Sequence, residues 1–200
     1  MSQVDPVRTP LSDEALIAAL EAAYVDCLGH EPKHETLAVL LAQIALETGH
    51  AASLICWNLG NYKRGPGPDW CAFETFEYVP SATVGRGAGV GTGTKTSMIC
   101  EFSAWPDLQS AAEFFVSALY GRWPEAWAGA VAGDPEAFSV GLRARGYYTA
   151  PVGLYAAGVR RWFAFYLALL GGDSAVTEPE LPVDAAGAAV LGITGLLDAL

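Results

Sequence analysis

The N-terminal part of the chain contains two stretches in which apolar residues recur at helical spacing. This spacing predicts one helix from Asp13 to about Leu28, capped by Ser12, and a second from Pro32 to Thr48. A glycine follows each stretch, at the place where a left-handed residue commonly ends a helix. The faces expected to be buried are Leu16, Leu20, Tyr24 and Cys27 in the first helix and Leu37, Leu40, Leu41 and Ile44 in the second.

The pattern changes after residue 53. Residues 53–68 are rich in turn formers and aromatic residues, so they are expected to form an ordered loop. Two stretches with alternating, β-prone residues follow, Cys71 to Val79 and Ser97 to Trp105. The residues between them include five alternating glycines from Gly85 to Gly93, which predicts a long β-hairpin with a glycine-rich tip.

Helical spacing returns after Pro106 and continues to Leu170. The expected helices cover 107–121, 124–132, 134–146 and 152–170, and the last of them should bury Tyr155, Val159, Trp162, Tyr166 and Leu169. The predicted fold class is therefore α+β, a mostly helical domain with an inserted β-hairpin. We expect one domain over 1–172, followed by an acidic linker and a short C-terminal segment over 173–200.

The charge of the chain limits the classes of partner. The net charge is −11, and phosphate binding requires clustered cations, so nucleic acid is not expected as a partner. Anionic lipid is disfavoured for the same reason. Part of the negative charge belongs to the residues after Leu170, which carry acids and no Lys or Arg. The N-terminus lacks the features of a secretory signal, and no stretch is long enough for a membrane span.

The four cysteines show no metal-binding pattern. Cys27, Cys56, Cys71 and Cys100 contain no C-x-x-C pair, which argues against a zinc ribbon. In a reducing compartment we expect four small apolar thiols, and a Cys71–Cys100 disulfide is the alternative. The histidines lack metal-helix spacing. His50 follows Gly49 and either caps the helix or touches a site near Glu47.

Glu47 is the most informative residue for chemistry. It lies three residues after Ile44 and seven after Leu40, so it shares the buried stripe of the second predicted helix. It also lies in the last helical turn, where the helix dipole disfavours a carboxylate. Both effects raise the pKa, as a general acid for glycosidic cleavage requires. The alternative is a glutamate at the helix edge that reaches solvent or the region of Asn58.

A glycosidase of this kind uses a second carboxylate as base, nucleophile or electrostatic partner. The first strand of the predicted hairpin offers Glu74 and Glu77. Because side chains alternate along a strand, only one of the two can face Glu47. The sequence leaves the choice between them open.

Five segments in this order and at these spacings resemble glycoside hydrolase family 73, the bacterial endo-β-N-acetylglucosaminidase domains of the lysozyme-like superfamily. The resemblance covers about residues 35–170, and no single motif carries it. The segments are AQIALETGH (42–50), NLGNYK (58–63), TFEYV (75–79), FSAWPDLQSAAEFF (102–115) and GYYTAPVGLYA (146–156).

This resemblance implies a role for individual residues. Glu47 matches the catalytic general acid, Glu77 matches the glutamate of the hairpin motif proposed as base or stabiliser, and Tyr147 matches an aromatic residue beside the acid. Asn58 and Asn61 match an asparagine-rich loop. The sequence departs from the family where Ala150, in place of an aspartate, follows Thr149. The resemblance implies no cofactor and no metal.

Aromatic residues gather in the loop, the hairpin and the turn before the last helix. Such residues suit the apolar faces of sugar rings, although some can pack in the core instead. The expected substrate-binding residues are Trp57, Asn58, Asn61, Tyr62, Trp70, Glu74, Tyr78, Tyr148 and Thr149.

The function that these observations favour is hydrolysis of the β-1,4 glycan bonds of bacterial peptidoglycan, of glucosaminidase or muramidase type. The alternatives are a lytic transglycosylase with the same fold, which gives 1,6-anhydro products, and an inactive glycan-binding module. We expect synthesis in the cytoplasm and action on the cell wall after release or delivery. The acidic tail is a candidate docking segment for a delivery or secretion apparatus.

Overall fold

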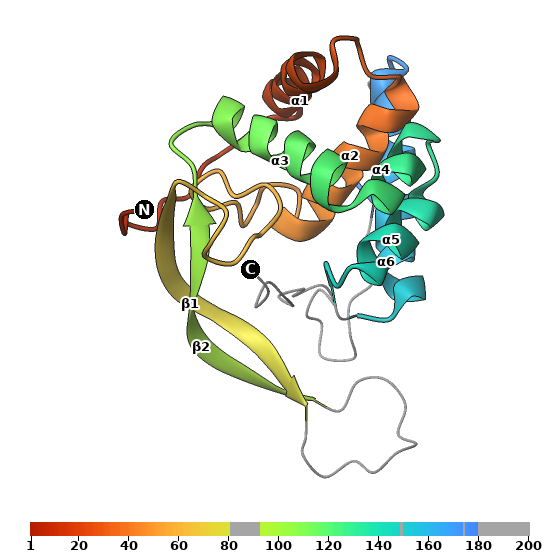
Figure 1. The fold of residues 1–200 in the computed structure, drawn as a ribbon. Helices are drawn as coiled ribbons and strands as arrows, with labels where there is room; N and C mark the ends of the chain where they lie inside the picture. The colour runs from red at the N-terminus through yellow and green to blue at the C-terminus, as the bar shows by residue number, and fades with distance from the viewer. Residues whose placement is uncertain (81–92, 149, 174, 180–200) are drawn as a thin grey trace.

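A computed structural model describes residues 1–80, 93–148, 150–173 and 175–179, without the side chains of 76–80 and 93–96. Helices surround a central helix, and a two-stranded hairpin projects from one side (Figure 1). The predicted tip at 81–92 and the segment 180–200 lie outside the described residues. The elements are α1 (Asp13–Leu28), α2 (His34–Thr48), β1 (Asp69–Pro80), β2 (Gly93–Ala104), α3 (Leu108–Arg122), α4 (Pro124–Val131), α5 (Pro135–Ala144) and α6 (Val152–Leu170).

The ends of the first two helices follow the sequence signals closely. Ser12 Oγ accepts a hydrogen bond of 3.3 Å from the Ala15 amide at the start of α1. Gly29 and Gly49 end α1 and α2 with φ of 76° and 59°, a left-handed backbone that glycine adopts at little cost. The second helix begins at His34 rather than at Pro32, because Lys33 is still extended and forms the N-cap.

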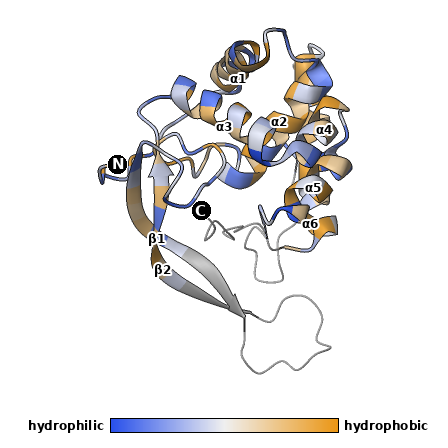
Figure 2. Ribbon diagram, in the orientation of Figure 1, coloured by the Kyte–Doolittle hydropathy of each residue, from blue (hydrophilic) through white to orange (hydrophobic). Residues whose placement is uncertain are grey.

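Helix α2 is the centre of the core, and it is buried on all sides rather than along one stripe. Every residue from Thr36 to Thr48 is buried, because α1, α4 and α6 pack around it. Hydrophobic residues fill its middle and hydrophilic ones its two ends (Figure 2). A helix that is apolar all round belongs inside a protein, so α2 is the rigid element from which its last turn is positioned. None of the helices in the described ranges combines the length and the hydropathy of a membrane span.

The four cysteines form no disulfide with one another, and they differ in burial. Cys56 and Cys71 are buried, and burial raises the pKa of Cys71 to about 12. Cys27 is exposed, so its expected place on the buried face of α1 is wrong. The core side of α1 ends with Tyr24, while Leu28 packs at the edge of the core.

The hairpin packs on the loop that follows α2. Strands β1 and β2 are antiparallel, with Cys71 opposite Phe102. Phe73 stacks on Phe102 with ring centroids 4.6 Å apart. A second, small core joins this face of the hairpin to the loop through Cys56, Cys71, Phe102 and Ala104. The loop therefore links the end of α2 to the base of the hairpin.

Candidate active site

The chain turns sharply at the end of α2, and Thr48 fixes this turn. Its hydroxyl donates to the Ile44 carbonyl at 2.7 Å and accepts from the Ala51 amide at 3.0 Å. His50 and Ala51 have φ of 54° and 63°, a left-handed backbone that non-glycine residues adopt at a cost. Such strain persists only where the surroundings enforce it, so the residues at the end of α2 are held in defined positions.

Glu47 lies in the last turn of α2 and is 8% exposed. The Tyr155 hydroxyl donates to Glu47 Oε1 at 2.9 Å. Burial raises the pKa of Glu47 from 4.5 to about 8, and the hydrogen bond from Tyr155 opposes this rise. No carboxylate or cation among the described side chains shifts this pKa. Glu47 is therefore a protonated, neutral acid at neutral pH.

Tyr155, from the first turn of α6, is the residue that holds this acid. Its ring is fully buried and stacks on Tyr148, with centroids 3.8 Å apart and planes 6° from parallel. Tyr148 is also fully buried, and its hydroxyl donates to the Ser139 carbonyl at 2.9 Å. Tyr148, which is predicted to bind sugar, therefore packs against the Tyr155 ring in the core.

Two more tyrosines complete the group around Glu47. Burial raises the pKa of Tyr62 and of Tyr147, and the charge of Glu47 raises both further. The Tyr147 hydroxyl donates to the Gly60 carbonyl at 2.9 Å. The Tyr62 hydroxyl interacts with the Tyr147 side chain, but it has no partner at full hydrogen-bond geometry in the described part of the chain.

Gly60 allows the two outer tyrosines to approach. A Cβ atom at this position would lie 2.4 Å from the Tyr62 ring. The Tyr62 ring in turn meets Tyr147 edge-on, with centroids 6.1 Å apart. Glycine at position 60 is therefore required to leave room for the Tyr62 ring.

Asn58 holds the loop in shape. Its Nδ2 donates to the carbonyls of Tyr62 and Ser103 at 2.8 and 3.0 Å, and its Oδ1 accepts from the Tyr62 amide at 2.8 Å. Asn58 is predicted to contact sugar, whereas in the structure its side-chain amide holds the backbone of Tyr62 in place. Asn61 and Trp57 are half-buried on the same loop and both have positive φ.

The two other described residues of the predicted sugar-binding set lie on the hairpin, with different partners. Trp70 lies at its base, where the Arg64 guanidinium stacks on the indole at 3.9 Å. The Trp70 backbone pairs with the N-terminal segment, an arrangement that the sequence did not reveal. Glu74 is exposed and accepts a hydrogen bond from the Ser97 hydroxyl.

Three candidate residues remain untested by this geometry. Glu77 and Tyr78 lie on β1 opposite Thr96 and Lys95, and their side chains are outside the described residues. Thr149 also lies outside them. The second carboxylate therefore stays a prediction.

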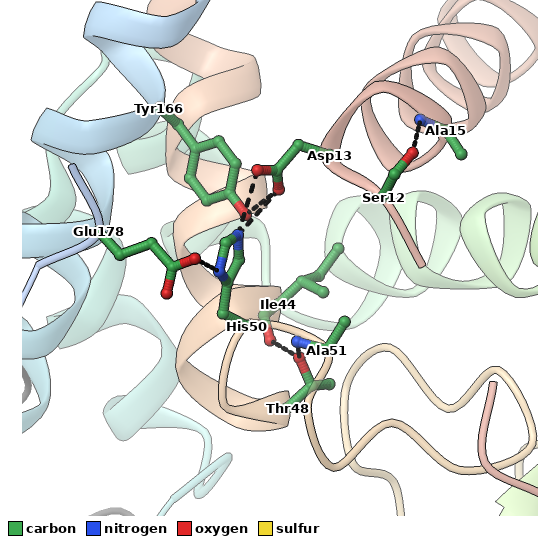
Figure 3. Close-up of polar contacts among 9 residues, drawn as sticks. All are labelled: Ser12, Asp13, Ala15, Ile44, Thr48, His50, Ala51, Tyr166 and Glu178. Atoms are coloured by element: carbon green, nitrogen blue, oxygen red, sulfur yellow. Dashed lines mark hydrogen bonds and ion pairs between the residues drawn. The ribbon is translucent and has the colours of Figure 1, made fainter. Parts of the chain in front are cut away.

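His50 belongs to a separate polar cluster that includes Asp13, Tyr166 and Glu178 (Figure 3). Its Nε2 lies 3.0 Å from Asp13 Oδ1, and its Nδ1 lies 3.1 Å from Glu178 Oε1. The Tyr166 hydroxyl also donates to Asp13, at 2.9 Å. We call these four residues the His50 cluster. It borders a cavity of about 270 Å³ that Glu47 does not line.

The charges of the His50 cluster stabilise each other. The hydrogen bond with Asp13 raises the pKa of His50 against the effect of burial, and the charges of Asp13 and Glu178 add to the rise. Burial alone would raise the pKa of Asp13, but hydrogen bonds from His50 and Tyr166 lower it overall. The cluster therefore joins α1, α6 and residues 175–179 to the turn after Glu47. The described side chains include no group of three His, Cys, Asp or Glu placed to hold a metal.

The Glu47 carboxyl can supply a proton to a bound molecule. A general acid works best when its pKa lies near the working pH, and a buried glutamic acid with a pKa of about 8 meets that condition. When Glu47 gives up its proton, the Tyr155 hydroxyl is already placed to stabilise the carboxylate that forms.

Comparison with known proteins gives structural matches only. No family model matches the chain, and no curated protein does. A peptidoglycan hydrolase mutant from Sphingomonas sp. A1 matches with a TM-score of 0.52 and 24% identity, over 75% of this chain and 92% of that one. The catalytic domain of the autolysin Auto from Listeria monocytogenes matches with a TM-score of 0.50 and 20% identity, over 82% and 89%. The chain has the mostly helical, lysozyme-like α+β fold of these two hydrolase structures.

Proposed function

We propose that this protein is a peptidoglycan hydrolase that cleaves β-1,4 glycosidic bonds of the glycan strand, with Glu47 as general acid. The observation that carries the proposal is the buried, neutral carboxyl of Glu47, which receives a hydrogen bond from Tyr155 and is surrounded by tyrosines. The fold shared with two cell-wall hydrolases supports the same substrate class.

In this mechanism Glu47 protonates the glycosidic oxygen as the bond to the anomeric carbon breaks. The proton moves from Glu47 to the leaving sugar, and the carboxylate that remains is stabilised by the Tyr155 hydroxyl. Tyr62 is the proposed contact for the sugar, because its buried hydroxyl has no partner at full hydrogen-bond geometry in the described part of the chain. Tyr147 supports this contact from the side.

The second carboxylate decides how the reaction ends. We propose Glu77 as the group that activates water or stabilises the oxocarbenium-like transition state, which gives a reducing-end product. A lytic transglycosylase that works with Glu47 alone is the second candidate. It is favoured by the finding that no described carboxylate acts on the pKa of Glu47.

Digestion of purified peptidoglycan with product masses tests both candidates. Reducing-end muropeptides support hydrolysis, and the sugar at the new end distinguishes a glucosaminidase from a muramidase. 1,6-Anhydro products support the transglycosylase. The absence of any soluble product from the wild-type protein would contradict both and favour a glycan-binding module.

Two matched variants on the hairpin test the second carboxylate. Glu77→Gln should abolish most hydrolysis, by about 10²-fold or more if it acts as base. Glu74→Gln is the control, because Glu74 is exposed and bonded to Ser97. Equal activity in all three proteins would remove Glu77 from the mechanism.

The route to the cell wall and the role of the tail form part of the proposal. We propose that the protein acts on the wall after release or delivery, and that residues 180–200 serve delivery rather than catalysis. A chain that ends at residue 179 keeps the His50–Glu178 ion pair. It should digest isolated peptidoglycan at the wild-type rate, and a large loss of that activity would contradict this assignment of the tail.

A further inference from the structure

Gln43 is a buried polar residue to which the mechanism above assigns no role. It lies on α2 one turn before Glu47 and is 0% exposed. Neither its Oε1 nor its Nε2 has a hydrogen-bond partner among the described residues. All its neighbours in the sequence from Leu37 to Ala42 are apolar and buried. The amide is therefore an exception in the most hydrophobic part of the core.

An amide in this position has a cost. Leaving a buried donor or acceptor unpaired costs about 1–3 kcal/mol, whereas an apolar side chain of the same size would pack without that penalty. Polar groups that break a local packing rule are expected at functional sites. The position of Gln43 beside the proposed acid is consistent with such a site.

The geometry of α2 and α6 directs Gln43 to Tyr155. Residues four apart on a helix lie on the same face, so Gln43 and Glu47 are neighbours there. Tyr155 uses its one hydroxyl proton on Glu47 Oε1, which leaves the lone pairs of its oxygen to accept a hydrogen bond. Burial raises the pKa of Tyr155, and a hydrogen-bonding interaction with the Gln43 side chain opposes part of this rise, although the Gln43 amide does not reach full hydrogen-bond geometry in this state.

We propose that Gln43 is a positioning residue that acts through Tyr155: its Nε2–H donates to the Tyr155 oxygen while Glu47 gives up its proton, and this keeps the Tyr155 hydroxyl on the new carboxylate. The inference rests on the proposed role of Glu47 as general acid. A chain of two hydrogen bonds then runs from amide to phenol to carboxylate. Each bond strengthens the next, because a phenol that accepts a hydrogen bond is a better donor.

The test is a double-mutant cycle of Gln43→Met and Tyr155→Phe on the full chain. Two quantities are measured: the midpoint of the Glu47 carboxyl titration by ¹³C NMR, and the pH profile of kcat on peptidoglycan. Each single variant should move the midpoint and the alkaline limb of the profile to higher pH, because the ionised form of Glu47 loses support. Each should lower kcat by about two- to tenfold, the factor for one hydrogen bond.

The decisive comparison is the double variant. If Gln43 acts through Tyr155, the double variant has the same midpoint as Tyr155→Phe alone. Trp162→Phe is the matched control. It removes Trp162 Nε1–H, another buried donor without a partner among the described residues. The Trp162 ring lies beside His50. This control should leave the Glu47 titration unchanged. Gln43→Leu is a second variant to use if methionine packs poorly.

Two results would overturn the proposal. One is a Glu47 midpoint that Gln43→Met leaves unchanged, and the other is a shift that adds in full to that of Tyr155→Phe. The titration needs no substrate, so it separates this inference from the proposed function. Wild-type protein that fails to cleave peptidoglycan contradicts the function, while the cycle still decides whether Gln43 supports Glu47 through Tyr155.

Discussion

Glu47 and His50 are three residues apart at the end of α2, and the fold treats their charges in opposite ways. Glu47 is buried with tyrosines and meets no cation among the described residues, so burial favours its neutral form. His50 lies between Asp13 and Glu178, whose negative charges favour its cationic form. Burial keeps a proton on Glu47. The His50 cluster, in contrast, joins four segments of the chain through ion pairs and a hydrogen bond.

This difference has an energetic meaning. A buried acid without a charged partner destabilises the fold once it ionises, so the burial of Glu47 is expected to cost stability in exchange for reactivity. The His50 cluster contains paired and partly exposed charges, which stabilise modestly. The comparison predicts that substitution of Glu47 lowers activity and removes a cost in stability. Substitution of His50 should instead lower stability and leave most of the activity.

The largest expected effect is on catalysis. Glu47→Gln should lower peptidoglycan lysis by about 10²- to 10⁴-fold, because it removes the proton donor. The glutamine can still accept the hydrogen bond from Tyr155, so the fold should be kept, as circular dichroism can check. His50→Gln is the matched control at the same turn and should retain most of the activity. Comparable losses in both variants would show that the turn, and not the acid, is what matters.

The next effect is on stability against pH. The pKa of Glu47 is about 8 in the folded protein and near 4.5 when unfolded, so between these values only the folded state keeps the proton. The unfolded state then binds fewer protons, and stability falls as pH rises, by up to about 1.4 kcal/mol per pH unit. Glu47→Gln should remove this term. In urea titrations from pH 5 to 8, the free energy of unfolding of the variant should rise progressively relative to that of wild type. A difference between the two proteins that does not change with pH would argue against a raised pKa.

A smaller effect concerns the His50 cluster. The folded pKa of His50 is raised, so its contribution is fully present below the unfolded value of 6.5 and is lost as pH rises through the folded value. His50→Gln should cost about 1 kcal/mol at pH 6 and less at pH 9, since both partners are partly exposed. Thermal unfolding at the two pH values measures this, and an equal loss at both would mean that packing on Trp162 dominates.

The smallest effect is expected at Glu178. Its side chain is 65% exposed, so Glu178→Gln should change stability by less than about 1 kcal/mol. Added salt should weaken the ion pair with His50, so the difference from wild type should shrink at high ionic strength. A large loss that salt does not change would point to an apolar role for this segment, in which Val176 packs against the core.

The sequence predicted the helices of the fold and the burial of Glu47, because these depend on local patterns. Helical spacing predicted that Glu47 is buried, although α2 is buried on all sides and not only along the predicted stripe, and Gly49 marked the end of that helix. The spacing also marked Tyr155 as a core residue, but it could not show what the hydroxyl meets, since Glu47 lies 108 positions away. Such a contact arises from the packing of α6 on α2.

Polar groups were the hardest to assign for the same reason. Asn58 was expected to face sugar, but its amide is used to shape the loop. Gln43 was not singled out, because one amide within an apolar helix has no periodic signal. Cys27 continued the apolar stripe of α1 but is exposed, since periodicity does not show where the core ends.

The most direct test of the central claim is the titration of the Glu47 carboxyl carbon in the wild-type protein, with Glu47→Gln to assign the signal. We predict a midpoint near pH 8, far above the ordinary 4.5 of a glutamate, and a further rise in Tyr155→Phe. A midpoint close to 4.5 would contradict the account, because Glu47 would then be ionised at neutral pH and could not serve as the proton donor.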